Sequence, residues 1–238
     1  MKQHLSSTSR FDCRPQPTIC GRGAATLALA VWLAGPGPAL LAQQEASGPG
    51  GRGVTFTKDF PGSVPAYYSV TVRESGDAVY KTEPEDAAPV EFRLPAEVTS
   101  EIFSLVGKLG GSPEQSLESK RRVANMGKKT VEYRNGAERF TASFNHTEVP
   151  EALALLGLFE RISATQQHAL RLEYMVQFDR LGVVKALLQL EADLDGGRLL
   201  GAAQLVPVLE RIRNDRAIVQ LAKGRAAQIL GKIQAERF

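Results

Sequence analysis

The amino-acid sequence predicts an α+β fold: an antiparallel sheet of two hairpin-helix units, followed by an all-α C-terminal helical region. Apolar and polar residues alternate in short stretches between residues 67 and 144, as in strands with one buried face. Two longer stretches carry apolar residues at helical spacing instead. From Thr165 onward only the helical spacing remains.

The strongest local signal is Asn135-Gly136, which is flanked by alternating residues over 129–144. Asn-Gly favours a two-residue hairpin turn because both turn positions need positive φ. With that centre, Glu132 faces Arg139 across the two strands. One face then collects the apolar side chains of Val131, Tyr133, Phe140, Ala142 and Phe144. A lone hairpin is marginal in water, so further strands and helices must cover this face.

The other elements follow from the same patterns. Pro61, Gly62 and Pro65 interrupt residues 54–65, which we interpret as an extended lead-in. Strands are expected over 68–72, 78–82, 90–94 and 121–126. One helix should follow Pro95, with Val98, Ile102, Leu105, Val106 and Leu109 on its buried face. A second should be capped by Thr147, with Leu153, Leu156, Phe159 and Ile162 buried.

The C-terminal region should contain three helices. The first continues from Leu170 to Leu194, and its apolar set, which includes Tyr174 and Phe178, is too broad for one face, so we expect it to be buried on more than one side. The second covers 199–214, and Asp215 caps the third. These helices are similar to HEAT-like helical hairpins, with too few units for a solenoid.

The N-terminal segment has the order of a cleavable secretory signal. Residues 1–23 are polar and basic, 24–34 are apolar, and Gly-Pro pairs precede Ala42, after which we expect cleavage. The apolar run is shorter than the roughly 20 residues that span a bilayer. An uncleaved anchor and a mitochondrial transit peptide are the alternatives. The predicted parts are a signal peptide (1–42), a disordered linker and extended lead-in (43–62), an α+β sheet domain (63–164) and a helical region packed on it (165–238).

The charge balance argues against a nucleic-acid partner. Of the 29 basic and 26 acidic residues, four and one lie in residues 1–42, which leaves 25 of each in the expected mature chain. A neutral chain lacks the basic footprint of a nucleic-acid-binding protein. Cys13 and Cys20 are the only cysteines, and both precede Ala42, so disulfides and thiol chemistry are not expected after cleavage.

Motifs of known catalytic and metal sites do not occur in the sequence, so we expect no catalytic residues, no metal and no cofactor. His146 and His168 lie outside any metal-ligand spacing, and we expect structural roles for both. Carboxylates cluster at Glu83, Glu85 and Asp86 and again at Asp193 and Asp195, where solvated loop charges are favoured over a weak calcium site. Because Asp193 and Asp195 end a helix, they call for a nearby cation such as Arg198.

Basic residues cluster before and at the start of the predicted hairpin, at Lys120, Arg121, Arg122, Lys128 and Lys129. Charged edges prevent exposed strands from pairing with other chains, which is the favoured interpretation. The alternative is an anionic-ligand or membrane-surface patch. The chain from Arg198 onward is also basic, with eight basic residues against three acidic ones.

Three segments between Tyr67 and Ile162 carry a resemblance: YYSVTVRESGDAVY, VEFRLPAEVTSEIFSLVGKL and TVEYRNGAERF. They resemble the small hairpin-and-helix α+β domains of uncharacterised exported bacterial proteins. The resemblance implies export and supplies no catalytic residues.

Together these observations predict an exported, periplasmic or secreted, non-catalytic binding protein that engages another protein or an envelope component. Two alternatives stay open. One is a peripheral protein held at an anionic membrane surface by its basic C-terminal helices, and the other is an enzyme with a site of dispersed carboxylates and Arg residues. The sequence does not predict the oligomeric state.

Overall fold

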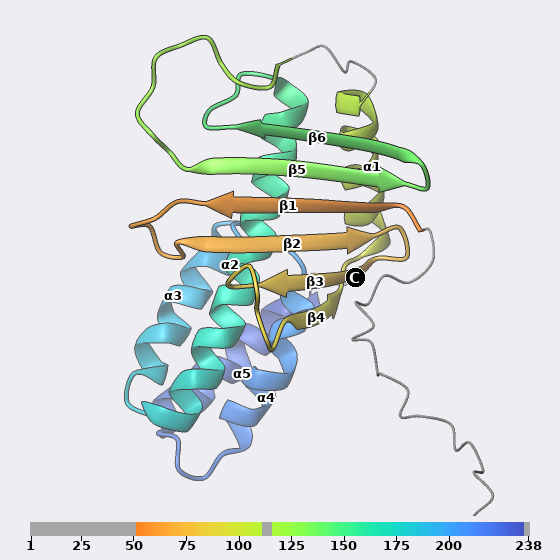
Figure 1. Ribbon diagram of the computed structural model, residues 1–238. Coiled ribbons are helices and arrows are strands. Elements are labelled where there is room, and N and C mark those ends of the chain that lie inside the picture. The colour runs from red at the N-terminus through yellow and green to blue at the C-terminus, as the bar shows by residue number, and fades with distance from the viewer. Residues whose placement is uncertain (1–50, 111–115, 236–238) are drawn as a thin grey trace, which may run out of the picture. The chain divides into compact units, whose positions relative to one another are not determined.

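Six strands form one sheet in the order β4-β3-β2-β1-β5-β6, and every neighbouring pair is antiparallel (Figure 1). The computed structural model describes residues 51–110 and 116–235. The strands are β1 (Gly53–Asp59), β2 (Tyr67–Arg73), β3 (Asp77–Lys81), β4 (Val90–Arg93), β5 (Lys128–Asn135) and β6 (Glu138–Phe144). The α+β class is therefore confirmed, while the predicted signal peptide lies outside the described residues.

Strand β1 lies in the middle of the sheet, between β2 and β5, where the sequence predicted only an extended lead-in. Val54 and Phe56 point to the inner face and are fully buried, whereas Thr55 and Thr57 lie on the outer face. The alternation in this segment is short, and a proline follows two residues after the strand ends. β1 is held in place by pairing with β5, which is distant in sequence, so the local pattern alone does not predict a central strand.

The guanidinium group of Arg52 holds the start of β1 in place. The Arg52 guanidinium lies 5.4 Å from the ring centroid of Phe103 and 6.0 Å from that of Tyr133. Arg52 also donates hydrogen bonds to the Tyr133 hydroxyl and the Glu74 carboxylate. The face of an aromatic ring attracts a guanidinium group electrostatically. These contacts hold the first residues of β1 against β5 and against the helix that contains Phe103.

The turn of the β5–β6 hairpin lies one residue later than predicted. Asn135 pairs with Glu138, so the two turn residues are Gly136 and Ala137, and Gly136 has φ +57°. The predicted pair of Glu132 with Arg139 is wrong, because Glu132 faces Thr141. Moving the turn by one residue shifts each partner by two positions, which leaves the two faces unchanged. The predicted apolar face is therefore the inner face of the sheet.

The predicted strand over 121–126 is a loop, and β5 begins only at Lys128. Asparagine side chains replace strand pairing here: Met126 N donates to Asn145 Oδ1 (2.6 Å) and Gly127 N to Asn125 Oδ1 (2.9 Å). Gly127 has φ +84° and lies against Phe60, so an added Cβ would clash with that ring. These contacts stop the strand from extending backwards.

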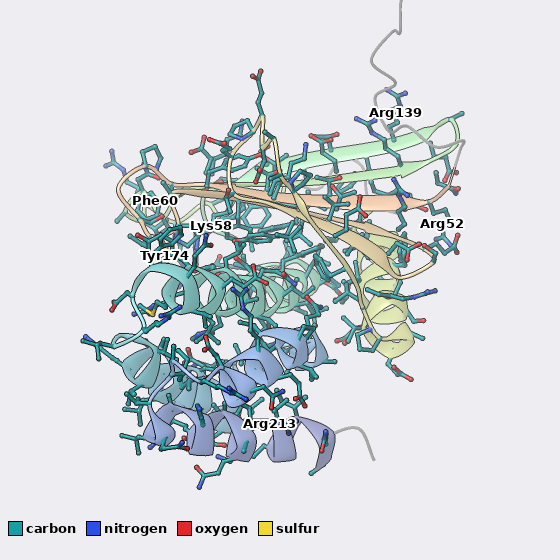
Figure 2. All side chains as sticks on the ribbon, turned by 90° about the horizontal axis from the view of Figure 1, so that it is seen from below. Arg52, Lys58, Phe60, Arg139, Tyr174 and Arg213 are labelled. Carbon is teal, nitrogen blue, oxygen red and sulfur yellow. The ribbon has the colours of Figure 1, made fainter. Side chains whose placement is uncertain are left out.

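All the helices of the described chain lie on one side of the sheet (Figure 2). They are α1 (Ala96–Gly110), α2 (Pro150–Phe178), α3 (Val183–Asp195), the 3₁₀ turn η1 (Ala202–Leu205), α4 (Val206–Asn214) and α5 (Gln220–Ala235). The predicted face of α1 is confirmed, because Ile102, Val106 and Leu109 are buried. Thr147 is not the cap of α2; its Oγ1 accepts a hydrogen bond from Val149 N before the helix begins.

Helix α2 links two hydrophobic cores. Its first half packs on the sheet, where Phe159 stacks on Phe56 with ring centroids 4.8 Å apart and Ile162 is fully buried. Leu172 and Val176 in its second half belong to the core of the C-terminal helices. The helix runs through residues 164 and 165 without a break. Leu153, which was predicted to be buried, is exposed.

The helix predicted from Leu170 to Leu194 is broken at 179–182, and α3 starts at Val183. Asp179 causes the break, because its Oδ1 accepts a hydrogen bond from Gly182 N (3.0 Å) in place of the helical pattern. The predicted burial of this apolar set is wrong for part of it. Tyr174 and Phe178 are 62% and 65% exposed, whereas Leu172, Val176, Leu187 and Leu190 are buried.

Candidate functional site

The five basic residues predicted as a patch do not share one environment. Lys120, Arg121, Arg122 and Lys128 are exposed in and after the loop before β5. Arg121 forms an ion pair with Glu148 (2.9 Å). Lys129 is only 4% exposed and lies on the inner face of the sheet, so it is separated from the other four.

Lys129 holds the chain on both sides of the β5–β6 hairpin. Its Nζ donates to the carbonyl oxygens of Met126 (2.8 Å) and Asn145 (2.7 Å). Burial and the neighbouring cation Lys58, which faces it across β1 and β5, lower the pKa of Lys129. This lysine therefore has a structural role in closing the loop over 121–127.

The two carboxylate clusters are also held by local contacts. Asp86 accepts hydrogen bonds from the backbone of Thr82 and Ala88, which lower its pKa. Asp193 lies between His168 Nε2 (2.7 Å, to Oδ2) and Arg198 Nε (2.7 Å, to Oδ1). The expected compensation of Asp193 by Arg198 is confirmed. Burial disfavours the charged form of Asp193, but the hydrogen bonds from His168 and Arg198 outweigh it and lower its pKa.

The basic C-terminal stretch is partly neutralised by α3. Glu191 binds Arg225 and Lys232 of α5, and Lys232 also reaches Asp195 at 2.7 Å. With the Arg198–Asp193 pair and the Arg213–Glu210 pair within α4, four of the eight cations counted from the sequence form ion pairs with described residues. Fewer cations of this region are therefore available to an anionic membrane surface.

Two adjoining hollows follow the exposed side of α2. The larger, of about 610 Å³, lies between α2, Glu101 of α1 and Arg198. The smaller, of about 510 Å³, lies between α2, the β1–β2 loop at Val64-Pro65 and α3. Ala164 lines both hollows, so they meet at the middle of the helix. We name this surface the α2 groove.

Small residues form the floor of the α2 groove. Because Ala154, Gly157 and Ala164 carry a small side chain or none, they leave the backbone of α2 accessible in the groove. A Cβ added to Gly157 would meet nothing within 4 Å. Arg161 lines the larger hollow and Arg171 the smaller, and neither forms an ion pair with any residue in the described ranges. The groove thus offers an apolar floor with two available guanidinium groups.

One imidazole lines the α2 groove in addition to its carboxylates and guanidinium groups. His168 is the one histidine lining it, and its Nε2 is committed to Asp193. Over 51–110 and 116–235, no group of three or more His, Cys, Asp or Glu side chains could hold a metal ion. No hydroxyl of the described residues is hydrogen-bonded to His168, so a nucleophile paired with a base is not assembled there. The sequence analysis did not identify this groove, because its floor is built from small residues.

Comparisons with known proteins add no relative: no protein-family model matches the chain, and no curated protein matches it significantly. Among the helices of the described ranges, none has the length and apolar character needed to cross a membrane.

Proposed function

We propose that the protein is an exported, non-catalytic binding protein that holds a polypeptide partner in the α2 groove. The observation that supports this most directly is the pair of adjoining hollows, which meet at Ala164 along an exposed helix. A small-residue floor lets a second backbone approach closely, and the guanidinium groups of Arg161 and Arg171 supply directional donors. Exposed apolar side chains at the end of the same helix, Tyr174 and Phe178, extend the contact surface.

The outer face of the sheet is less suited to a partner. Its threonine and serine hydroxyls already pair across strands, as in Thr55 with Thr71 (3.1 Å) and Thr130 with Ser143 (2.9 Å). Large apolar side chains lie on the inner face instead, under the helices. A binding surface is therefore better supported on α2 than on the sheet.

The two alternatives from the sequence have weaker support. A peripheral membrane role would use the basic C-terminal helices, but three of their cations are already paired: Arg225 and Lys232 with carboxylates of α3, and Arg213 with Glu210 of α4. An enzyme with dispersed carboxylates and Arg residues would need them to converge. Asp193 is instead held by His168 of α2 and by Arg198, and Glu191 by Arg225 of α5.

Two proposals on architecture accompany the function. The sheet would derive from two hairpin-and-helix units, because α1 follows β4, α2 follows β6, and both helices lie on the same face. The helices after α2 would be HEAT-like hairpins that widen the surface available to a partner.

A photoreactive amino acid at position 177 tests the binding role in cells that express the full chain. Gln177 is exposed beside Phe178 at the end of α2, so the substitution leaves both the fold and the groove intact, and position 224 on α5, where an added Cβ has open space, serves as the control. We expect one discrete adduct from position 177, none from 224, and loss of the adduct when Arg171→Glu is added. Equal labelling from both positions, or no adduct from 177, would contradict the proposal.

A further inference from the structure

The exposed side of α2 carries a coiled-coil spacing. Eight positions follow one another at alternating steps of four and three residues: Leu153, Gly157, Glu160, Ala164, Gln167, Arg171, Tyr174 and Phe178. This is the spacing of the a and d positions of a heptad, which keeps one seam of a helix facing a partner helix. The seam runs along the α2 groove and ends at the exposed pair Tyr174–Phe178, whose ring centroids lie 5.0 Å apart.

The side chains along this seam are available to a partner. Leu153, Tyr174 and Phe178 are exposed although they are large and apolar. Glu160 has one ion pair, to Lys58 at 3.5 Å, and both side chains are partly in solvent, where such a pair contributes little. In Figure 2, Tyr174 lies at the same edge of the view as Lys58 and Phe60. The large apolar side chains at the two ends of the seam are therefore open to a partner in the described part of the chain.

The seam is also complementary to itself when reversed. Its eight positions are symmetric about the point between Thr165 and Gln166, so an antiparallel copy of the helix meets it in matched layers. The layers join Leu153 to Phe178, Gly157 to Tyr174, Glu160 to Arg171 and Ala164 to Gln167. A two-fold axis at the centre makes each layer occur twice.

The chemistry of each layer fits this arrangement. The two ends of the seam bury apolar side chains against each other, Phe178 on Leu153. The ring of Tyr174 enters the space that Gly157 leaves open. Glu160 meets Arg171, one of the two groove cations that have no ion pair among the described residues. A parallel pairing in register would instead place Glu160 on Glu160 and Arg171 on Arg171, which like-charge repulsion disfavours.

We propose that the partner in the α2 groove is a second copy of this chain, packed through an antiparallel α2–α2 seam over residues 153–178. This inference rests on the proposed binding role of the groove and specifies its occupant. With a rise of about 1.5 Å per residue, the seam is about 38 Å long. The polar layers in its middle fix the register and direction of pairing at a cost in affinity.

Sedimentation of the purified full chain over a range of concentrations tests this occupant. Wild type should reach the mass of a dimer. Gly157→Trp should weaken dimerisation by at least about tenfold because it fills the space that the partner's Tyr174 needs, whereas Gly224→Trp on α5 should leave it unchanged. Arg171→Glu should weaken it by a similar factor, and adding Glu160→Arg should restore it, since the swapped charges again face each other. Thermal unfolding of each variant shows whether it is folded.

The outcomes separate this inference from the proposed function. Wild type that stays monomeric, or a dimer that Gly157→Trp and Arg171→Glu leave unchanged, would overturn the second copy as the occupant. If the adduct from position 177 in cells contains a different polypeptide, the binding role stands and this inference fails. If that adduct is absent, both fail. An adduct of two copies together with recovery in the charge-swapped double variant supports both.

Discussion

Two tyrosines on the inner face of the sheet differ in what their hydroxyl groups contact. Their ring centroids are 6.1 Å apart. The Tyr80 hydroxyl lies 3.2 Å from Ser163 Oγ on α2, whereas the Tyr68 hydroxyl is buried without a hydrogen-bond partner in the described part of the chain. Burial raises the pKa of both groups, and the hydrogen bond from Ser163 opposes that rise for Tyr80. The two residues therefore form a matched pair for substitution.

Tyr80→Phe should lower the free energy of unfolding by about 0.5–1.5 kcal/mol, because it removes a net favourable hydrogen bond between the sheet and α2. Tyr68→Phe should leave stability unchanged or raise it, because it removes a buried polar atom without a partner. Urea unfolding of both variants beside wild type measures the difference. An equal loss in the two variants would mean that the Tyr68 hydroxyl has a partner.

Gly136 is the residue on which the β5–β6 turn depends. Its φ of +57° is strained for a β-branched side chain and tolerated by asparagine. Gly136→Val should destabilise the fold by about 1–3 kcal/mol, and Gly136→Asn by much less. Denaturant midpoints of the three proteins test this. Equal midpoints for wild type and Gly136→Val would contradict the turn geometry.

At the scale of elements, the sequence predicted what local periodicity controls. The face of α1 and the two faces of the β5–β6 hairpin follow directly from spacings of 3.6 and 2 residues. The hairpin faces remained correct although the turn was displaced, because the partner shift was an even number of residues. Contacts distant in sequence were not predictable in this way. Strand β1 depends on its pairing with β5. The break at 179–182 is local, but it rests on a single side-chain hydrogen bond to Asp179, which leaves no periodic signal in the sequence.

The candidate site shows the same limit. Lys129 does not belong to the predicted basic patch, because it is buried on the inner face of β5, whereas Lys128 is exposed. Two consecutive lysines give no sequence signal that one of them is buried. The α2 groove was missed because Gly157 and Ala164 give no apolar signal, and because the apolar residues nearby fit a buried helix equally well. Only the packing of Leu172 and Val176 in the second core shows which side of α2 is free.

The Asp193 carboxylate of α3 joins His168 of α2 to Arg198, and these contacts lower its pKa. An Asp whose pKa is lower in the folded state contributes stability above its unfolded pKa and loses it as pH falls through the folded value. Asp193→Asn should therefore lower the free energy of unfolding by about 1–3 kcal/mol at neutral pH. The difference from wild type should shrink as the pH falls below 3.8, the ordinary pKa of an aspartate. Thermal unfolding from pH 7 to pH 3 measures it. Glu173→Gln, a change of an exposed carboxylate on α2, should show no such cost. A cost for Asp193→Asn that does not vary with pH would contradict the assignment.

At the scale of the whole described chain, α2 makes the sheet and the C-terminal helices one folding unit. A chain ending at Gln166 keeps the half of α2 that packs on the sheet and loses Leu172 and Val176 together with the second core. We expect this fragment to aggregate or to bind a hydrophobic dye, because the remaining helix is left uncovered where α3, η1 and α4 pack on it. Cooperative unfolding with the stability of the full chain would show that the two halves are independent.

The central claim is that the open side of α2 binds a second α2 in the antiparallel sense. A distance measurement between spin labels on the two copies tests it most directly, with Cys13 and Cys20 replaced by serine and a single cysteine at Ala154 or at Gln177. These positions flank the seam and lie equally far from its centre, so both labels should report the same separation, about 35 Å from the rise of a helix. A parallel seam would bring each pair to about 8–10 Å, the distance between packed helix axes. Unequal separations, that short distance, or no interaction between labels would contradict the claim.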